Sequence, residues 1–169
     1  MKNLKTAYIL LGGNLGDRML MLDNAQKQIA KLAGEVVKVS GDYETAAWGV
    51  EDQPSFFNRV LAIQTDKEPM QLLETLQQIE LDLGRERHVK WGARLIDIDI
   101  LFYEDEVIDL PRLKVPHPFL HERRFTLVPL AEIAENYLHP VLKKSVSALL
   151  ECCPDELEVQ PLKSVQAAG

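Results

Sequence analysis

The chain has few cysteines, no long apolar run near its start and fewer basic than acidic residues. Its two cysteines, Cys152 and Cys153, are adjacent, which makes a strained disulfide and a poor zinc site. The apolar run near the N-terminus covers only residues 7–11, too short for a signal peptide or a membrane span. We therefore expect a cytoplasmic protein with no membrane partner.

The charge balance excludes a second group of functions. The sequence carries 26 acidic residues against 19 Lys and Arg, for a net charge of −7. Proteins that bind duplex DNA or a membrane surface need a broad basic face, so we expect no nucleic-acid partner. With 46% hydrophobic residues among 169, the chain can build a full core. We expect one domain over residues 1–169, with a core at about 6–150 and a tail at 154–169.

Hydrophobic periodicity predicts four strands and four helices. The strands are expected at residues 5–11, 35–45, 56–65 and 94–103. Helices are expected at 17–34, 69–83, 121–135 and 145–150. The order β-α-β-β-α-β predicts an α+β, ferredoxin-like sandwich with a C-terminal helical extension. The helices should cover one face of an antiparallel sheet and leave the other free for ligands.

The most informative segment runs from Gly84 to Asp99. Four cations come before two acids, Asp97 and Asp99, which lie within an apolar run. Because strand side chains alternate, the two carboxylates should share a face, about 6.5 Å apart along the backbone. Apolar side chains should occupy the other face; they are Ile96, Ile98, Ile100 and Phe102.

Two readings of this acidic pair stay open. An Asp-x-Asp sequence can simply make an edge strand soluble. Alternatively, two close carboxylates on a core strand require a cation, and a hard ion such as Mg²⁺ suits oxygen ligands. Neighbouring arginines then indicate a polyphosphate substrate, because Arg binds phosphate with two parallel hydrogen bonds. The cations are Arg85, Arg87, Lys90 and Arg94.

Other patterns suggest a ligand site, and each has a plainer explanation. Phe56 and Asn58 should project from one side of a strand, where a ring and a carboxamide can hold a flat heterocycle, or Phe56 can be core. His117 lies between two prolines, as a phosphate contact or a surface histidine. The glycine-rich residues 12–18 favour a tight turn over a phosphate loop. Glu80 either anchors an arginine or marks a helix edge.

Three separated segments together resemble the 6-hydroxymethyl-7,8-dihydropterin pyrophosphokinase family. They lie at residues 45–58, 80–99 and 115–125, and the opening glycine-rich segment also fits. The resemblance covers about residues 6–150. It implies a stand-alone monomer that transfers pyrophosphate from ATP to the pterin hydroxymethyl group and releases AMP, a step of folate biosynthesis. It also implies two Mg²⁺ ions held by Asp97 and Asp99.

The resemblance assigns the other roles by position. Arg85 and Arg94, with the two aspartates, would be catalytic. The residues expected to bind ATP are Gln77, Arg85, Arg87, Trp91, Arg94, Ile100, Arg112, Leu113, His117 and Arg123. Among them, Arg87 and Trp91 would belong to a lid. The residues expected to bind the pterin are Thr45, Trp48, Phe56, Asn58 and Phe125, with the two phenylalanines enclosing the ring.

The sequence departs from the family pattern at five positions, and two other functions remain open. The departures are Gly13, Ala47, Lys90, Ala93 and Phe119. A ferredoxin-like RNA- or ligand-binding module would need a basic surface and exposed stacking aromatics. A Mg²⁺-dependent phosphohydrolase would share the carboxylates and arginines but use water as acceptor.

Overall fold

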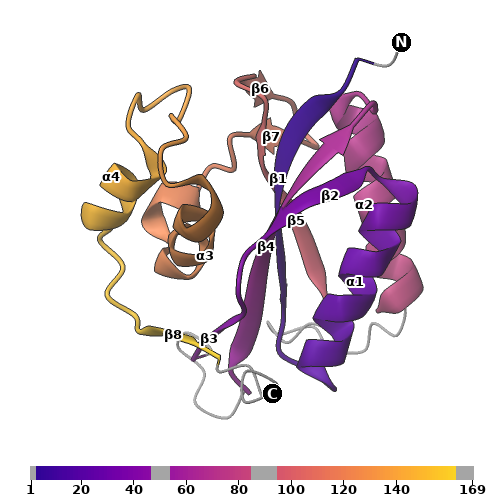
Figure 1. The fold of residues 1–169 in the computed structure, drawn as a ribbon, viewed down its shortest axis with the longest axis horizontal. Helices are drawn as coiled ribbons and strands as arrows, with labels where there is room; N and C mark the ends of the chain where they lie inside the picture. The colour runs from indigo at the N-terminus through magenta and orange to yellow at the C-terminus, as the bar shows by residue number, and fades with distance from the viewer. Residues whose placement is uncertain (1–2, 47–53, 85–94, 163–169) are drawn as a thin grey trace.

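A computed structural model describes residues 3–46, 54–84 and 95–162. Two helices separate groups of strands in the first part of the chain, and two further helices follow (Figure 1). In order they are β1 (Lys5–Gly13), α1 (Arg18–Leu32), β2 (Glu35–Val39), β3 (Tyr43–Thr45), β4 (Phe56–Thr65), α2 (Pro69–Leu83), β5 (Asp97–Tyr103), β6 (Ile108–Asp109), β7 (Lys114–Val115), the 3₁₀ turn η1 (Leu120–Glu122), α3 (Arg124–Ala134), α4 (Val146–Glu151) and β8 (Val159–Pro161).

The main sheet has six strands and antiparallel pairings. Its order is β5-β1-β4-β3-β8, and β2 also pairs with β4. Strands β1 and β4 are long and almost wholly buried, which places them at the centre of the sheet. Strand β5 forms one edge of this order, so one side of its backbone remains available for contacts outside the sheet.

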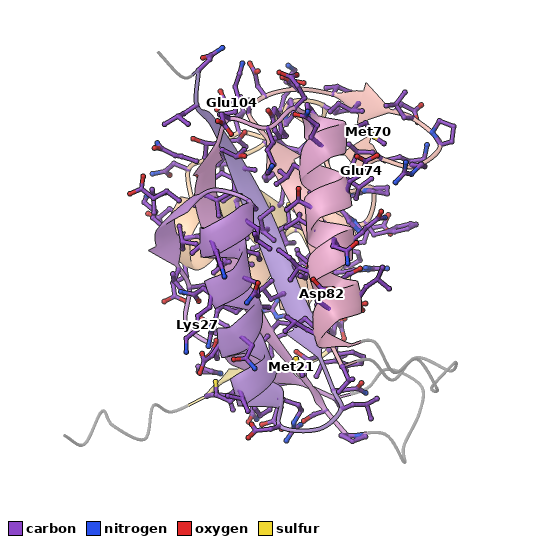
Figure 2. The ribbon with its side chains drawn as sticks, turned by 90° about the vertical axis from the view of Figure 1, so that its right-hand side faces the viewer. Met21, Lys27, Met70, Glu74, Asp82 and Glu104 are labelled. Atoms are coloured by element: carbon purple, nitrogen blue, oxygen red, sulfur yellow. The ribbon has the colours of Figure 1, made fainter. Side chains whose placement is uncertain are left out.

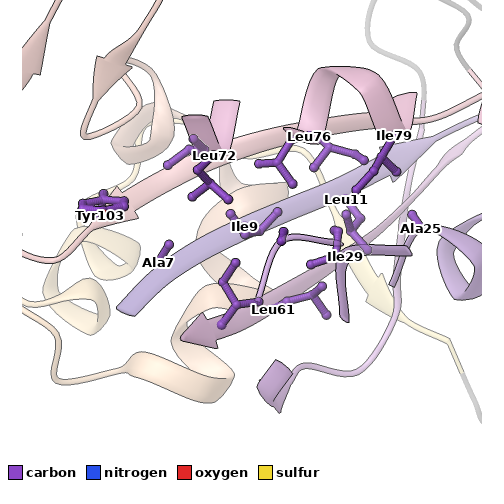
Figure 3. Close-up of a cluster of buried hydrophobic side chains, with 14 of the residues drawn as sticks. Ala7, Ile9, Leu11, Ala25, Ile29, Leu61, Leu72, Leu76, Ile79 and Tyr103 are labelled. Carbon is purple, nitrogen blue, oxygen red and sulfur yellow. The ribbon is translucent and has the colours of Figure 1, made fainter. Parts of the chain in front are cut away.

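Helices α1 and α2 lie side by side on one face of the sheet (Figures 1 and 2). Asp17 caps α1 by accepting a hydrogen bond from the Leu20 backbone N–H, while α2 begins with Pro69. Both helices bury an apolar stripe against alternate residues of β1, β4 and β5. Figure 3 shows part of this core, formed by Ala7, Ile9, Leu11, Ala25, Ile29, Leu61, Leu72, Leu76, Ile79 and Tyr103.

The opposite face of the sheet is not free, contrary to the expectation from the sequence. Helices α3 and α4 cover it, as Figure 1 shows on the left of the sheet. A second core joins them to the strands, formed by Tyr8, Leu10, Val60, Ala62, Leu101, Phe102, Leu120, Leu127, Leu130, Ala134, Val146 and Leu149. The alternating apolar residues of β1 and β4 supply both cores, because successive strand side chains point to opposite faces.

A β-bulge in β5 corrects the position of one predicted side chain. Ile9 pairs with Ile100 and Tyr8 pairs with Phe102, so Leu101 is an extra residue. Ile98 and Ile100 face α1 and α2 as predicted, but the bulge shifts Phe102 to the second core.

Several predicted boundaries also differ, and the larger differences are these. The strand expected at 35–45 divides into β2 and β3, because the Ser40 hydroxyl replaces a backbone partner and accepts from the Val60 N–H at 2.9 Å. The helix expected at 121–135 is η1 followed by α3, and residues 159–161 of the expected tail form β8. Among the described residues, no helix is long and apolar enough to cross a membrane.

Candidate active site

Asp97 and Asp99 lie on the same face of β5, as predicted. Both are half-buried, and their register partners on β1 are Gly12 and Leu10. Leu10 belongs to the second core, so the carboxylates rise from the face that α3 and α4 partly cover. Ile98 between them points into the first core and is 4% exposed. The strand therefore holds two carboxylates in parallel over a rigid apolar support.

Glu80 of α2 fixes the outer edge of β5 between the two aspartates. Its Oε2 accepts a hydrogen bond from the Ile98 backbone N–H at 2.6 Å. This contact satisfies a backbone donor that an edge strand would otherwise leave unpaired. The sequence left two explanations open, an arginine anchor or the edge of a helix. Neither described this bond, by which Glu80 holds strand β5.

A row of residues in register crosses three strands beside the carboxylates. Asn58 of β4 faces Gly12 of β1, and Gly12 faces Asp97 of β5. Neighbouring strands are about 4.8 Å apart, so about 10 Å separates the ends of this row. A ligand that reaches from Asn58 to Asp97 would need about this length, which is close to that of a fused two-ring heterocycle with a short substituent.

Asn58 presents an oxygen at this position that no described residue pairs with. The side chain is 3% exposed, and its Nδ2 donates to the Leu11 carbonyl oxygen at 3.2 Å. Its Oδ1 is buried without a hydrogen-bond partner among the described residues. A Cβ on Gly12 would lie 2.4 Å from the Asn58 Nδ2, so glycine is needed for the amide to lie over β1. An unsatisfied buried acceptor is costly, which points to a ligand that donates to it.

Thr45 and Phe56 extend this site along the same face of the sheet. Thr45 of β3 pairs with Phe56 of β4, two residues from Asn58 and therefore on the same face. Thr45 is 3% exposed, and its Oγ1 also lacks a partner within the described parts of the chain. Phe56 is half-buried, so it is not a fully enclosed core residue.

The residues that follow β7 form an aromatic and cationic cluster. The His117 backbone N–H donates to the Leu101 carbonyl at 3.0 Å, which attaches this segment to the β5 edge. The Arg123 guanidinium lies 5.0 Å from the Phe119 ring centre and 5.7 Å from that of Phe125. Phe125 itself is in the first turn of α3. The predicted phosphate contacts and the predicted stacking residue are thus neighbours.

His117 is held as a neutral imidazole by a hydrogen bond to one of its ring nitrogens. Its Nδ1 accepts from the Phe119 backbone N–H at 3.2 Å, which assigns the ring proton to Nε2. Burial, with a smaller contribution from the positive charge of Arg123, lowers the pKa of His117 to about 4. At neutral pH, Nε2–H can therefore donate to an anion that Arg123 also binds.

The remaining described residues predicted to bind ATP lie around α2 and the β5 edge. The Arg112 side chain is 3.3 Å from Gln77 Oε1, so these two are brought together. Ile100 and Leu113 are 5% and 6% exposed, and both side chains belong to the first core. Ile100 can bind a ligand through its backbone. It lies two residues after Ile98 on β5, so its N–H and C=O point to the same outer edge of the sheet as the Ile98 N–H.

Comparison with known proteins identifies the relatives of this chain. A family model described as 7,8-dihydro-6-hydroxymethylpterin-pyrophosphokinase matches residues 8–135, which is more than half of the sequence. The chain belongs to this family. It is therefore a pyrophosphokinase, an enzyme of folate biosynthesis.

Individual relatives agree with the family match. The 2-amino-4-hydroxy-6-hydroxymethyldihydropteridine pyrophosphokinase of Aquifex aeolicus is 45% identical over 82% of this chain and 86% of its own length. The protein of the same name from Methylorubrum extorquens is 49% identical over 77% and 83%. A crystal structure of wild-type Plasmodium falciparum HPPK-DHPS superposes with a TM-score of 0.72 at 17% identity, which supports the fold. This chain spans 45% of that longer protein.

Five predicted site residues of the pyrophosphokinase lie outside the described residues. They are Trp48, Arg85, Arg87, Trp91 and Arg94.

The glycine-rich segment of the pyrophosphokinase has a positioning role that the sequence did not reveal. Asn14 is fully buried, and its Nδ2 donates to the Pro54 carbonyl at 3.1 Å. Arg18 donates to the Ser55 carbonyl at 2.8 Å and lies 4.0 Å from the Phe57 ring centre. The segment thus fixes the start of β4, which carries Phe56 and Asn58. It also ends in the cap of α1, as expected for a tight turn that leads into a helix.

Proposed function

We propose that the row from Thr45 and Asn58 to Asp97 and Asp99 is the active site of this pyrophosphokinase. The chain transfers pyrophosphate from ATP to the hydroxymethyl group of 6-hydroxymethyl-7,8-dihydropterin, giving the pterin diphosphate and AMP. The observation that supports the pterin position is the buried Oδ1 of Asn58, which has no hydrogen-bond partner in residues 3–46, 54–84 and 95–162.

The pterin end of the site combines unpaired acceptors with aromatic rings. A pterin carries amino and ring N–H groups at one edge, and Asn58 Oδ1 and Thr45 Oγ1 are buried acceptors without partners in the described residues. Phe56 extends from the same strand face, and Phe125 comes from α3, which contacts β4 and β3. We propose that the two rings enclose the pterin, and that Trp48 completes its polar edge.

The carboxylates fit a metal whose remaining ligands come from substrate. Asp97 and Asp99 offer oxygen ligands on one strand face, and no group of three or more His, Cys, Asp or Glu suitable for a metal occurs in residues 3–46, 54–84 and 95–162. A hard ion with two carboxylates and open positions suits Mg²⁺ bound to ATP, and we propose two such ions. When bound, Mg²⁺ neutralises charge on the phosphate oxygens.

Cationic and hydrogen-bonding groups would bind the nucleotide. We propose that His117 Nε2–H and Arg123 donate to the triphosphate, where Arg123 neutralises negative charge. Gln77, Arg112, Leu113 and the backbone of Ile100 would contact the rest of the nucleotide. The family resemblance adds Arg85 and Arg94 as phosphate contacts and Arg87 and Trp91 as parts of a lid.

Three broader features belong to the same proposal. The strand order β5-β1-β4 with β2 and β3 beyond β4 supports a ferredoxin-like core, to which α3 and α4 are an extension. We propose that the enzyme acts as a monomer, with small molecules as its only substrates. Its use of ATP favours the cytoplasm.

Substitution of the carboxylates tests this function. In Asp97→Asn and in Asp99→Asn, transfer should fall by about 100-fold or more, because a neutral amide is a poor ligand for Mg²⁺, while the nearly isosteric side chain keeps the fold. AMP and pterin diphosphate should form in equal amounts, and only when both substrates are present, as measured by chromatography. Asp105→Asn, on an exposed turn of the same chain, is the matched control and should keep full activity.

Two outcomes would contradict the proposal. Either carboxylate variant retaining near-normal transfer would remove the metal assignment. Steady release of ADP or inorganic phosphate would instead indicate an ordinary kinase or a phosphohydrolase.

A further inference from the structure

The segment after α4 contacts two elements that carry the proposed pterin site. Its strand β8 pairs with β3, and Val159 lies directly opposite Thr45. Beyond the strand, the Leu162 N–H donates to the Asp42 carbonyl at 2.8 Å. The same segment also reaches α3, which contacts β8. Residues 155–162 therefore connect the element that carries Thr45 with the helix that carries Phe125.

Asp155 makes the contact with α3. Its Oδ2 accepts from the backbone N–H of Arg124, the first residue of the helix, at 3.0 Å. Its Oδ1 accepts from the Leu157 N–H at 2.9 Å, which orients the carboxylate. The residue at the N-cap position is Arg123, whose side chain makes no capping bond. Asp155 thus supplies from 31 residues away the acceptor that helix starts usually find locally.

The capped end of α3 is also its functional end. Arg123 and Phe125 flank the backbone group that Asp155 holds. Farther along the helix, Glu132 Oε1 accepts from the Tyr43 hydroxyl at 2.6 Å and from the Gly41 N–H at 3.0 Å. The two attachments lie about two turns apart, so together they set the orientation of α3 on the sheet.

We propose that Asp155 is a positioning residue for pterin binding. By capping α3 and orienting the strand that pairs with Thr45, it sets the place of Phe125 relative to the sheet side of the site. Asp155 has no contact with substrate in this scheme and acts through Phe125. The inference rests on the proposed function, because it takes Phe125 and Thr45 as pterin contacts.

Steady-state kinetics of the full-length Asp155→Ala enzyme test this role. Loss of a cap allows the first turn of α3 to move, so the KM for the pterin should rise about five- to tenfold, with the KM for ATP changed less than twofold. Asp155→Asn should restore the pterin KM to near the wild-type value, because Asn caps helices about as well as Asp.

A matched control separates positioning from general stability. Ser145 caps α4 by accepting from the Ala148 N–H at 3.1 Å, so Ser145→Ala removes a cap from another helix. It should lower the melting temperature by an amount similar to Asp155→Ala and leave the pterin KM unchanged. Equal rises of the pterin KM in both variants would show that Asp155 is merely structural and would overturn the proposal.

A second comparison separates this inference from the proposed function. Phe125→Ala should weaken pterin binding strongly, as measured by titration with 6-hydroxymethylpterin. If Phe125→Ala weakens binding and Asp155→Ala does not, the positioning role is wrong and the site stands. If Phe125→Ala itself has no effect, the pterin site is wrong and the inference fails with it.

Discussion

Gly12 shows how a single missing side chain shapes the site. The amide of Asn58 occupies the space above it, and a Cβ there would lie 2.4 Å from Nδ2. Nothing in residues 12–18 of the sequence distinguished this glycine from its neighbours, because its requirement comes from a strand 46 residues later. The need for glycine becomes visible only once β1 pairs with β4, which places Gly12 opposite Asn58.

We expect Gly12→Ala to act through Asn58. The new methyl group would displace the Asn58 amide from the Leu11 carbonyl. The amide would then be oriented differently, and its Oδ1 would no longer point toward the pterin. Pterin affinity, measured by titration calorimetry, should fall by about 1–3 kcal/mol, the usual effect of a misplaced buried hydrogen-bonding group.

Gly41→Ala is the matched control for this substitution. A Cβ on Gly41 would make an ordinary contact of 3.5 Å with Glu132 Oε1. Pterin affinity should therefore stay close to the wild-type value. A Gly12→Ala enzyme that binds pterin normally would show that the Asn58 amide does not contact the ligand.

His117 gives a prediction for pH. Burial and the charge of Arg123 lower its pKa to about 4, from an ordinary value of 6.5. Above pH 6.5, the imidazole is neutral in both folded and unfolded chains, and its contribution to stability is fully present. Between pH 6.5 and 4 the unfolded chain binds the extra proton, so the free energy of unfolding falls as pH falls.

His117→Asn should reduce that slope. Asparagine keeps an acceptor for the Phe119 N–H but does not titrate, so the pH dependence of the variant between pH 6.5 and 4 should be shallower. Urea unfolding at several pH values gives the comparison, with the wild type as reference. Identical slopes would mean that the folded and unfolded pKa values of His117 are alike.

At the scale of elements, the position of β5 depends on one side chain of α2. The Ile98 N–H donates to Glu80 Oε2 at 2.6 Å, on the free edge of the strand that carries both aspartates. Glu80→Ala would leave this donor unpaired and should lower the free energy of unfolding by about 1–3 kcal/mol. Transfer should fall as well, because the strand that orients the carboxylates is less constrained.

Glu80→Gln distinguishes anchoring from charge. Glutamine retains an acceptor oxygen, so it should keep most of the stability and activity that alanine loses. Denaturant unfolding and product formation measure the two effects. A glutamine variant as impaired as alanine would indicate that the negative charge of Glu80, rather than the bond to β5, is what matters.

Local patterns predicted the elements, but not how they pack. The spacing of Leu22, Ala25 and Ile29 predicted α1, and strict alternation placed Asp97 and Asp99 on one face. The cover provided by α3 and α4 was missed because the apolar stripe of a helix does not say which sheet face it meets. The bulge at Leu101 was missed because it depends on the pairing with β1.

In the site, too, relations between residues close in sequence could be predicted, and those between distant segments could not. Phe56 and Asn58 could be recognised as a pair because they are two residues apart on one strand. The link between Phe125 and Arg123 was visible in sequence, whereas that between Arg124 and Asp155 spans 31 residues and was not. Ile100 and Leu113 were assigned to the nucleotide by resemblance, and their side chains proved to be buried in the core.

At the scale of the whole molecule, one chain supplies every described part of the proposed site. Its residues come from β1, β3, β4, β5, α2 and α3 and from the segments before and after β7. The two cores share the central strands β1 and β4, so both sides of the proposed site rest on the same strands. All of the contacts described above are made within one chain.

We therefore expect the enzyme to work as a monomer. Sedimentation equilibrium should give a mass near 19.1 kDa, and transfer per mole of chain should stay constant as the enzyme is diluted. An obligate dimer would behave differently, because dilution below its dissociation constant would lower the activity per chain. The Asp97→Asn variant gives a further check: mixed in excess with wild type, it should leave the wild-type rate unchanged. A fall in that rate would show that the two chains associate and that the site depends on the partner.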